Sequence, residues 1–172
     1  MIKGIIFDLD QTLIESNQAY PLRKNKNWEA VYKIIPNLYP YPEISELIKE
    51  LKSFNFLICI VTSSPRKYCE LVIKQWDWKI DATVCYHDTS KHKPHPEPIE
   101  LGLLRLGLEA KNVVTVGDSS IDIQAAKATG VFSIGVLWGS LNKVSLEDSN
   151  PELLCKTVRE LKEFLLSKKY GY

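Results

Sequence analysis

Short, largely apolar runs recur along this chain, at residues 4–7, 56–61, 113–116 and 131–136, with a weaker one at 82–86. A strand that is apolar on both faces is typical of a parallel sheet covered by helices on both sides. Segments with helix-like spacing of apolar residues separate the runs. This alternation predicts an α/β fold: a doubly wound parallel sheet of about five strands joined by right-handed crossovers.

The segments between the runs are expected to be helical. Helices are predicted at residues 44–51, 65–75, 99–106 and 121–129, with a final amphipathic helix starting at Asn150-Pro151. Ser64 is expected to cap the second of these helices, because a hydroxyl there accepts a hydrogen bond from a free amide of the first turn. Pro65 suits the first helical position.

The size and charge of the chain indicate one domain without a nucleic-acid surface. A chain of 172 residues buries roughly 70% of its unfolded surface, so it needs no disulfide or metal to hold it together. The formal net charge is +1, with acidic and basic residues mixed. We expect no signal peptide, because the first residues lead directly into a predicted strand, and no apolar stretch reaches membrane-spanning length. We therefore expect a cytoplasmic protein without membrane contact.

Cysteine usage agrees with this expectation. The four cysteines are Cys59, Cys69, Cys85 and Cys155, and none forms a C-x-x-C pair. Cys59 and Cys85 lie in apolar runs that resemble core strands. We interpret the cysteines as buried thiols in a reducing compartment.

Residues 15–41 interrupt the alternating pattern. We interpret this segment as a short cap-like insertion in a single domain that spans 1–172, with one short helix at 28–34. The insertion carries the basic cluster Arg23-Lys24-Asn25-Lys26 and several aromatic residues: Trp28, Tyr32, Tyr39 and Tyr41. These aromatic residues either form a substrate-stacking lid with the basic cluster or pack against the sheet.

Polar residues stand where the predicted strands end. They are Asp8 and Asp10 after the first strand, Thr62 and Ser63 after the second, Lys93 on the loop after the third, and Asp118 after the 113–116 strand. In doubly wound sheets, ligands bind beyond the carboxyl ends of the strands. The sequence therefore predicts one site at this edge.

Asp8 and Asp10 by themselves are better explained as the acidic end of a strand in a solvated turn. In an extended chain, however, residues i and i+2 point to the same side, so the two carboxylates would share one pocket. One carboxylate in such a pair can stay ionised and attack while the other carries a proton. Together with the other strand-end residues, this pair predicts chemistry on a phosphate group.

Each polar element at this edge has a use in phosphoryl transfer. Hydroxyls at Thr62 and Ser63 and the start of the following helix suit an anion. Asp8 and Asp118 offer the hard oxygen ligands that Mg²⁺ prefers. A cation at Lys93, together with Mg²⁺, would offset the repulsion between an attacking carboxylate and the phosphate. We therefore expect an Mg²⁺-dependent phosphomonoester hydrolase that forms an aspartyl-phosphate on Asp8.

Four motifs resemble those of the haloacid-dehalogenase-type (HAD) phosphatase superfamily. They are D-x-D-x-T at Asp8, Asp10 and Thr12, the strand followed by Thr62-Ser63, the lysine motif at Lys93, and G-D-S-x-x-D at Gly117, Asp118, Ser119 and Asp122. The resemblance covers most of the chain. Residues 117–139 are similar to phosphoglycolate-phosphatase-like members with a minimal cap.

The resemblance implies a role for each matching residue. Asp8 would be the nucleophile and a magnesium ligand, with Asp118 as a second ligand. Asp10 would be the general acid and base, with its backbone carbonyl also on the metal. Thr62, Ser63 and Lys93 would hold the phosphate, while Thr12 and Asp122 would support the site.

The chain departs from the family pattern at two points. Gln11 stands where many members have Gly, and the 15–41 insertion is much shorter than a full helical cap. A short lid gives fewer substrate contacts. A phosphorylated small molecule is the expected substrate. Two alternatives remain: a phosphoprotein or another large substrate, and a homo-oligomer in which a second subunit provides the cap.

Three alternatives remain at this point. The same residues serve a phosphotransferase or phosphomutase, although the short cap argues against it. A non-catalytic phosphate-binding module would be expected to lack Asp8, Asp10 or Lys93. A zinc site at His87, His92 and His95 with Cys85 is also conceivable, but their spacing matches no standard structural zinc site.

Overall fold

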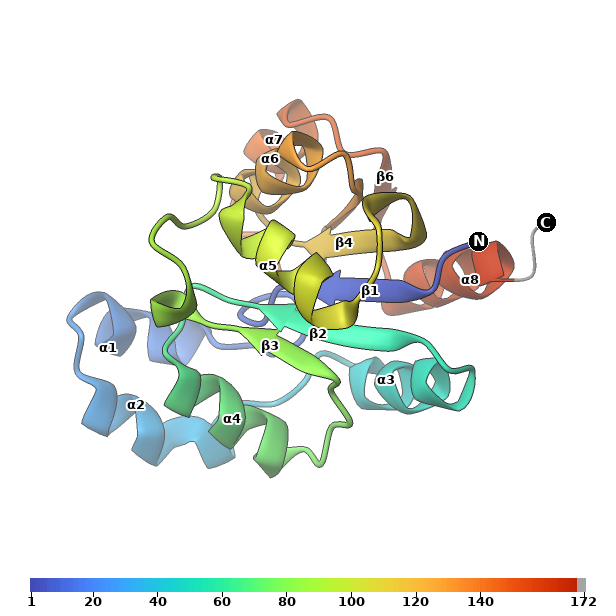
Figure 1. Ribbon diagram of the computed structural model, residues 1–172. Helices are drawn as coiled ribbons and strands as arrows, with labels where there is room; N and C mark the ends of the chain where they lie inside the picture. Colours follow the sequence, from blue (N-terminus) through green and yellow to red (C-terminus); the bar gives the residue numbers. More distant parts are fainter. Residues whose placement is uncertain (170–172) are drawn as a thin grey trace.

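The computed structural model describes residues 1–169 and contains a six-stranded, all-parallel sheet with the order β3-β2-β1-β4-β5-β6 (Figure 1). The strands are β1 (Gly4–Phe7), β2 (Leu57–Val61), β3 (Ala82–Val84), β4 (Val113–Gly117), β5 (Phe132–Val136) and β6 (Leu153–Cys155). The predicted fold class, an α/β doubly wound parallel sheet, is confirmed. Its strand order reverses beside β1, which is flanked by β2 and β4.

Helices cover both faces of the sheet (Figure 1). They are α1 (Tyr20–Lys24), α2 (Trp28–Ile34), α3 (Ile44–Ser53), α4 (Arg66–Gln75), α5 (Glu97–Leu106), α6 (Ser120–Ala128), α7 (Lys143–Asp148) and α8 (Val158–Lys169). Alternate residues of β1 point to opposite faces. Ile5 and Phe7 belong to one buried cluster, which includes residues of α3, α4 and α8, and Ile6 belongs to the other, with residues of α5 and α6.

Two local expectations were wrong. The chain after Asn150-Pro151 does not start a helix: Leu153–Cys155 adds a sixth strand to the edge of the sheet beside β5, and the helix begins at Val158. A strand of three residues is too short to show alternation, so its pairing partner decides its conformation. Ser64 does not cap α4 either: Pro65 occupies the cap instead of the first helical position, which is Arg66, and the Ser64 hydroxyl donates to Asp10.

The insertion is closed at its base by backbone pairing. The Glu15 amide donates to the Tyr39 carbonyl at 2.9 Å, and the Tyr41 amide donates to the Leu13 carbonyl at 3.1 Å. Between these bonds lie α1 and α2, and α2 has the bounds expected from the sequence. Val31 of α2 is fully buried and belongs to the same cluster as residues of α4. The insertion therefore packs on the main domain and has no separate core.

The loop after β1 is tied to two other segments. Gln11 adopts a left-handed conformation (φ +66°), and its side chain accepts from the Tyr41 hydroxyl at 2.6 Å. The Trp138 indole donates to the Thr12 carbonyl at 2.9 Å. A Cβ on Gly139 would lie 1.8 Å from the Gln11 carbonyl oxygen, so only glycine permits this approach. These contacts hold the Asp8–Thr12 loop in one conformation.

The four cysteines are buried and unpaired, as expected. Among residues 1–169, no helix combines the length and apolar character that crossing a membrane requires.

Candidate active site

Asp8 and Asp118 lie side by side because β1 and β4 are neighbouring parallel strands. Phe7 of β1 is in register with Val116 of β4, and the Asp8 amide donates to the Val116 carbonyl at 2.9 Å. Asp8 directly follows β1 and Asp118 directly follows β4, at the point where the strand order reverses. Such a switch point is where doubly wound sheets bind ligands.

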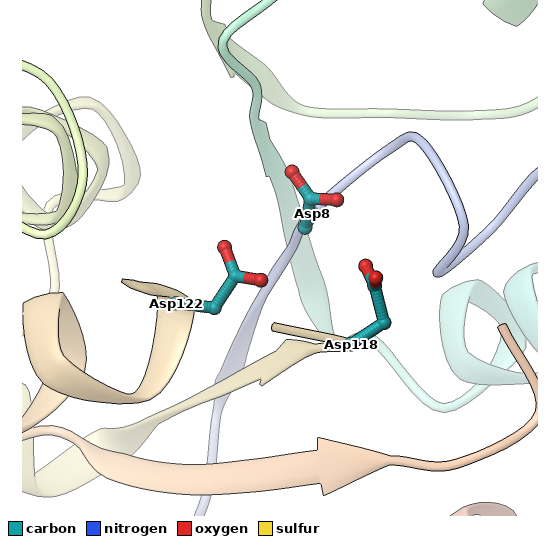
Figure 2. Close-up of side chains that lie close together, drawn as sticks. All are labelled: Asp8, Asp118 and Asp122. Atoms are coloured by element: carbon teal, nitrogen blue, oxygen red, sulfur yellow. The ribbon is translucent and has the colours of Figure 1, made fainter. Parts of the chain in front are cut away.

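Asp122, on the first turn of α6, completes a cluster of three carboxylates. Ligand oxygens of Asp8, Asp118 and Asp122 all lie within 4.8 Å of one another (Figure 2). Gly117 permits this approach, because a Cβ there would lie 2.4 Å from the Asp122 Cβ. Ser119 orients Asp122 by donating its amide and hydroxyl to Oδ2 at 3.1 and 2.8 Å.

Electrostatics within the cluster favour a bound cation. Burial raises the pKa of Asp8 to about 7, and the negative charges of Asp122 and Asp10 add to this rise while Lys93 opposes it. Burial also raises the pKa of Asp118 to about 8, with Asp8 and Asp122 adding to the rise. Carboxylates that repel one another in a buried site are the donor set that hard divalent cations bind.

Two of the three carboxylates have an oxygen free for a metal. Both Asp122 oxygens accept hydrogen bonds, Oδ1 from Lys93 and Oδ2 from Ser119. Asp8 and Asp118 each accept through Oδ1, and their Oδ2 atoms accept no hydrogen bond within residues 1–169. The residues present therefore fit Mg²⁺ with Asp8 and Asp118 as ligands.

Lys93 is the buried cation that balances this cluster. Its side chain is 4% exposed, and its Nζ donates to Asp8 Oδ1 at 2.7 Å, to Asp122 Oδ1 at 2.6 Å and to the Val61 carbonyl at 3.1 Å. Burial acts to lower the pKa of Lys93, but the carboxylates of Asp122 and Asp8 raise it above its usual value. Lys93 therefore stays charged beside Asp8 and Asp122.

Asp88 anchors the start of the loop that carries Lys93. Its Oδ2 accepts from the Arg66 guanidinium, from Arg105 Nη1 at 2.7 Å and from the Cys85 amide at 3.0 Å. Asp88 thus joins the beginning of α4 to the end of α5. Burial acts to raise the pKa of this carboxyl, but the hydrogen bonds outweigh it and lower the pKa to about 2.

Replacing Asp88 with Asn is expected to lower the free energy of unfolding by about 1 kcal/mol near neutral pH, allowing for solvent screening of the exposed arginines. Because the folded-state pKa lies below the ordinary value of 3.8, the contribution of Asp88 is present above pH 3.8 and is lost as the pH falls to about 2. Urea unfolding at several pH values measures this difference. Asp77→Asn, at an exposed position, is the control; a difference between Asp88→Asn and wild type that persists unchanged at pH 2 would contradict the assignment.

Asp10 lies apart from the carboxylate cluster and is held by other partners. Oδ2 accepts from the Ser64 hydroxyl at 2.8 Å, and Oδ1 accepts from the Tyr68 hydroxyl at 2.8 Å. Arg23 of the insertion makes an ion pair with Oδ1. The structure thus separates the two aspartates of D-x-D: Asp8 faces Lys93 and Asp118, whereas Asp10 faces α4 and the insertion.

Ser64, Tyr68 and Arg23 were not among the predicted site residues. Ser64 carried a signal, a hydroxyl directly after Thr62-Ser63, but it was interpreted as a helix cap. Arg23 was considered only as part of the basic cluster that would form a lid with the aromatic residues. Tyr68 carried no signal, because its approach to Asp10 depends on how α4 packs against the insertion.

The remaining predicted residues lie at the same edge. Thr12 is buried and donates to Asp118 Oδ1 at 2.8 Å. Thr62 Oγ1 accepts from the Ser64 amide at 3.1 Å, which shapes the turn before α4. Ser63 is exposed. All the predicted site residues except the buried Thr12 line one pocket of about 530 Å³.

The same pocket is bounded on its outer side by the insertion. Tyr20, Arg23, Lys24 and Trp28 line it there, together with Ile121 and Leu141 from the main domain. The other aromatic residues of the insertion have different roles; Tyr41 bonds to Gln11, and Tyr39 packs against Trp76 with ring centroids 5.5 Å apart. Trp28 thus borders the pocket, whereas Tyr39 and Tyr41 do not line it and Tyr39 is largely exposed.

The histidine-rich loop forms no metal cluster. His92 stacks on Tyr86 with centroids 4.0 Å apart, and His95 Nδ1 accepts from the Glu97 amide at 3.2 Å. Within the described residues, the carboxylates of Asp8, Asp118 and Asp122 are the one group of three or more side chains arranged to hold a metal ion.

Comparisons with known proteins agree with this architecture. The family model for haloacid dehalogenase-like hydrolases matches residues 21–136, a range that begins after Asp8 and Asp10 and includes Lys93 and Asp118. Two solved structures share the fold: a hydrolase from Pseudomonas syringae (TM-score 0.82, 19% identity, 96% of this chain and 98% of that chain) and CbbY from Rhodobacter sphaeroides in complex with phosphate (TM-score 0.80, 17% identity, 94% and 96%).

Two relatives indicate how much of a longer protein this chain matches. It is 28% identical over 123 residues to the phosphoglycolate phosphatase of Mannheimia succiniciproducens, a match that covers 70% of this chain and 55% of that protein. It is 25% identical to pyrophosphatase PpaX of Bacillus pumilus, covering 93% of this chain and 94% of that protein. The chain thus spans about half the length of the first relative and nearly all of the second. Because the family model covers well over half of the chain, this protein belongs to the haloacid dehalogenase-like hydrolase family.

Proposed function

We propose that this protein is a Mg²⁺-dependent phosphatase that hydrolyses phosphomonoesters through an aspartyl-phosphate on Asp8. The observation that carries the proposal is the position of Lys93. Its ammonium joins Asp8 to Asp122 at the bottom of the pocket, next to a carboxylate cluster suited to a divalent cation. Charge is thereby balanced at the one carboxylate that must approach a phosphate dianion.

In the proposed reaction, the phosphoryl group lies between Lys93 and the hydroxyls of Thr62 and Ser63. A carboxylate oxygen of Asp8 attacks phosphorus, and the bond from phosphorus to the leaving oxygen breaks. Asp10 protonates that oxygen, then accepts a proton from the water that hydrolyses the aspartyl-phosphate. Bound at Asp8 and Asp118, with the Asp10 carbonyl as a further ligand, Mg²⁺ would supply positive charge to the phosphoryl oxygens.

Asp122 and Thr12 serve as supports in this proposal. Asp122 holds Lys93 in place, and Thr12 orients Asp118. Neither needs to touch the substrate. The insertion at 15–41 acts as a short lid that leaves the pocket accessible.

The relatives suggest the kind of substrate. Their names, phosphoglycolate phosphatase and pyrophosphatase, both describe small phosphorylated molecules. We propose a small substrate of this kind and a cytoplasmic site of action, consistent with four buried, unpaired thiols. Neither a phosphoprotein substrate nor a homo-oligomer has a specific contact in its favour.

Phosphate release from a panel of phosphomonoesters and pyrophosphate tests the proposal. We expect hydrolysis that requires Mg²⁺ and stops when EDTA is added. Hydrolysis that is indifferent to EDTA would contradict the metal requirement. Binding of phosphate without hydrolysis of any compound in the panel would favour a binding module instead.

A further inference from the structure

Both oxygens of the Asp10 carboxylate have partners in this structure. Ser64 donates to one oxygen and Tyr68 to the other, and Arg23 adds a positive charge. The Asp10 side chain is 11% exposed. An acid that protonates a leaving group must present an oxygen to it. Tyr68 and Arg23 both contact Oδ1, so a leaving group that reaches this oxygen has to displace one of them.

Arg23 is the partner most easily exchanged. Its Nη1 is buried and pairs with Asp10, yet no acceptor among residues 1–169 is aligned with that atom as a hydrogen bond. Its guanidinium carbon lies 5.9 Å from the centre of the Tyr68 ring. Arginine binds carboxylate and phosphate groups best through two parallel hydrogen bonds. A ligand anion could offer Arg23 that geometry, which Asp10 does not.

The pocket places Arg23 where a leaving group would lie. Lys93 contacts Asp8 at the bottom, whereas Arg23, Lys24, Tyr20 and Trp28 form the wall contributed by the insertion. Lys24 makes no ion pair within the part of the chain that the structure describes. The wall thus holds two positive charges, one of which is neutralised only by Asp10.

We propose that Arg23 is a specificity-determining residue that exchanges Asp10 for a second anionic group on the leaving group of the substrate. This inference rests on the proposed phosphatase function and names its substrate class: phosphate esters or anhydrides that carry a carboxylate or a second phosphoryl group. The exchange leaves no charge unpaired on Arg23, and it frees Asp10 to protonate the leaving oxygen. A neutral leaving group offers no replacement, so Asp10 stays paired.

Equilibrium binding tests the exchange without turnover. The probes are phosphonoacetate, methylenediphosphonate and methylphosphonate, each titrated by calorimetry in the presence of Mg²⁺. Wild type is expected to bind at least one of the two probes with a second anionic group about tenfold more tightly than methylphosphonate, and Arg23→Gln to lose this margin. The probe that loses more affinity identifies the second group as carboxylate or phosphoryl.

Lys26→Gln is the matched control, because it removes one positive charge from an exposed residue close to Arg23 that does not line the pocket. Lys26→Gln is expected to keep the tenfold preference for the doubly anionic probe over methylphosphonate. Equal affinity of wild type for all three probes, or a margin that survives Arg23→Gln, would overturn the proposal. A thermal melt establishes that Arg23→Gln is folded.

Turnover provides an independent measurement. The ratio of kcat/KM for carboxyphenyl phosphate to that for phenyl phosphate is expected to fall about tenfold in Arg23→Gln. Equal losses on both esters would overturn the proposal, because a purely structural role affects both. If wild type hydrolyses neither ester, the phosphatase function fails, and the phosphonate margin still decides the role of Arg23.

Discussion

Asp8→Asn is expected to abolish Mg²⁺-dependent hydrolysis, with a loss on the order of 10³-fold or more in kcat. The amide cannot attack phosphorus, so no aspartyl-phosphate forms. Asp8 also provides one of the two carboxylates with a free oxygen for the metal. The substitution therefore removes both the proposed nucleophile and a proposed metal ligand.

The measurement is phosphate release from an aryl phosphate, together with hydroxylamine trapping of the acyl phosphate in the wild type. Asp148→Asn, at an exposed acidic residue on α7, is the matched control and should keep full activity. Circular dichroism should show that Asp8→Asn is folded, since amide and carboxylate have nearly the same shape. Hydrolysis retained in Asp8→Asn would rule out covalent catalysis at this residue.

Lys93→Met is expected to be the most destabilising substitution in the site. It removes the ammonium that pairs with Asp8 and Asp122, leaving buried carboxylates without a compensating charge. Breaking a buried ion pair by removing one partner costs about 3–5 kcal/mol. Urea unfolding in EDTA should show a decrease in the free energy of unfolding of this size.

Addition of Mg²⁺ should recover part of the stability of Lys93→Met, because a cation that binds only the folded state stabilises it. The double variant Asp8→Asn, Lys93→Met should be less destabilised than Lys93→Met alone, because one unpaired charge is removed. Lys91→Met, an exposed lysine on the same loop, is the control. If Lys93→Met were as stable as wild type in EDTA, the role of Lys93 in balancing the cluster would be refuted.

The sequence predicted the central strands well because each is apolar on both faces. The 56–61 and 113–116 runs became β2 and β4, which flank β1. The edge strand β6 was missed because its own sequence carries too little pattern. Leu153–Cys155 is short, and only its pairing with β5 makes it a strand.

The carboxylate cluster was partly visible in the sequence. Asp8 and Asp118 were expected together because each follows a buried strand, and the carboxyl ends of neighbouring parallel strands meet. The sequence could not reveal that both oxygens of Asp122 are engaged, by Lys93 and Ser119. Those bonds depend on the close approach of α6 to Gly117.

The sequence by itself determined the α/β class, the strand ends that carry the polar residues, and the chemistry that those residues suit. Local pattern is sufficient for this, since burial on both faces and alternation with helices are properties of contiguous residues. The tertiary structure alone decided the surroundings of Asp10. Arg23 comes from the insertion, Ser64 from the turn after β2, and Tyr68 from α4. Only the packing of the insertion on α4 brings all three to one carboxylate.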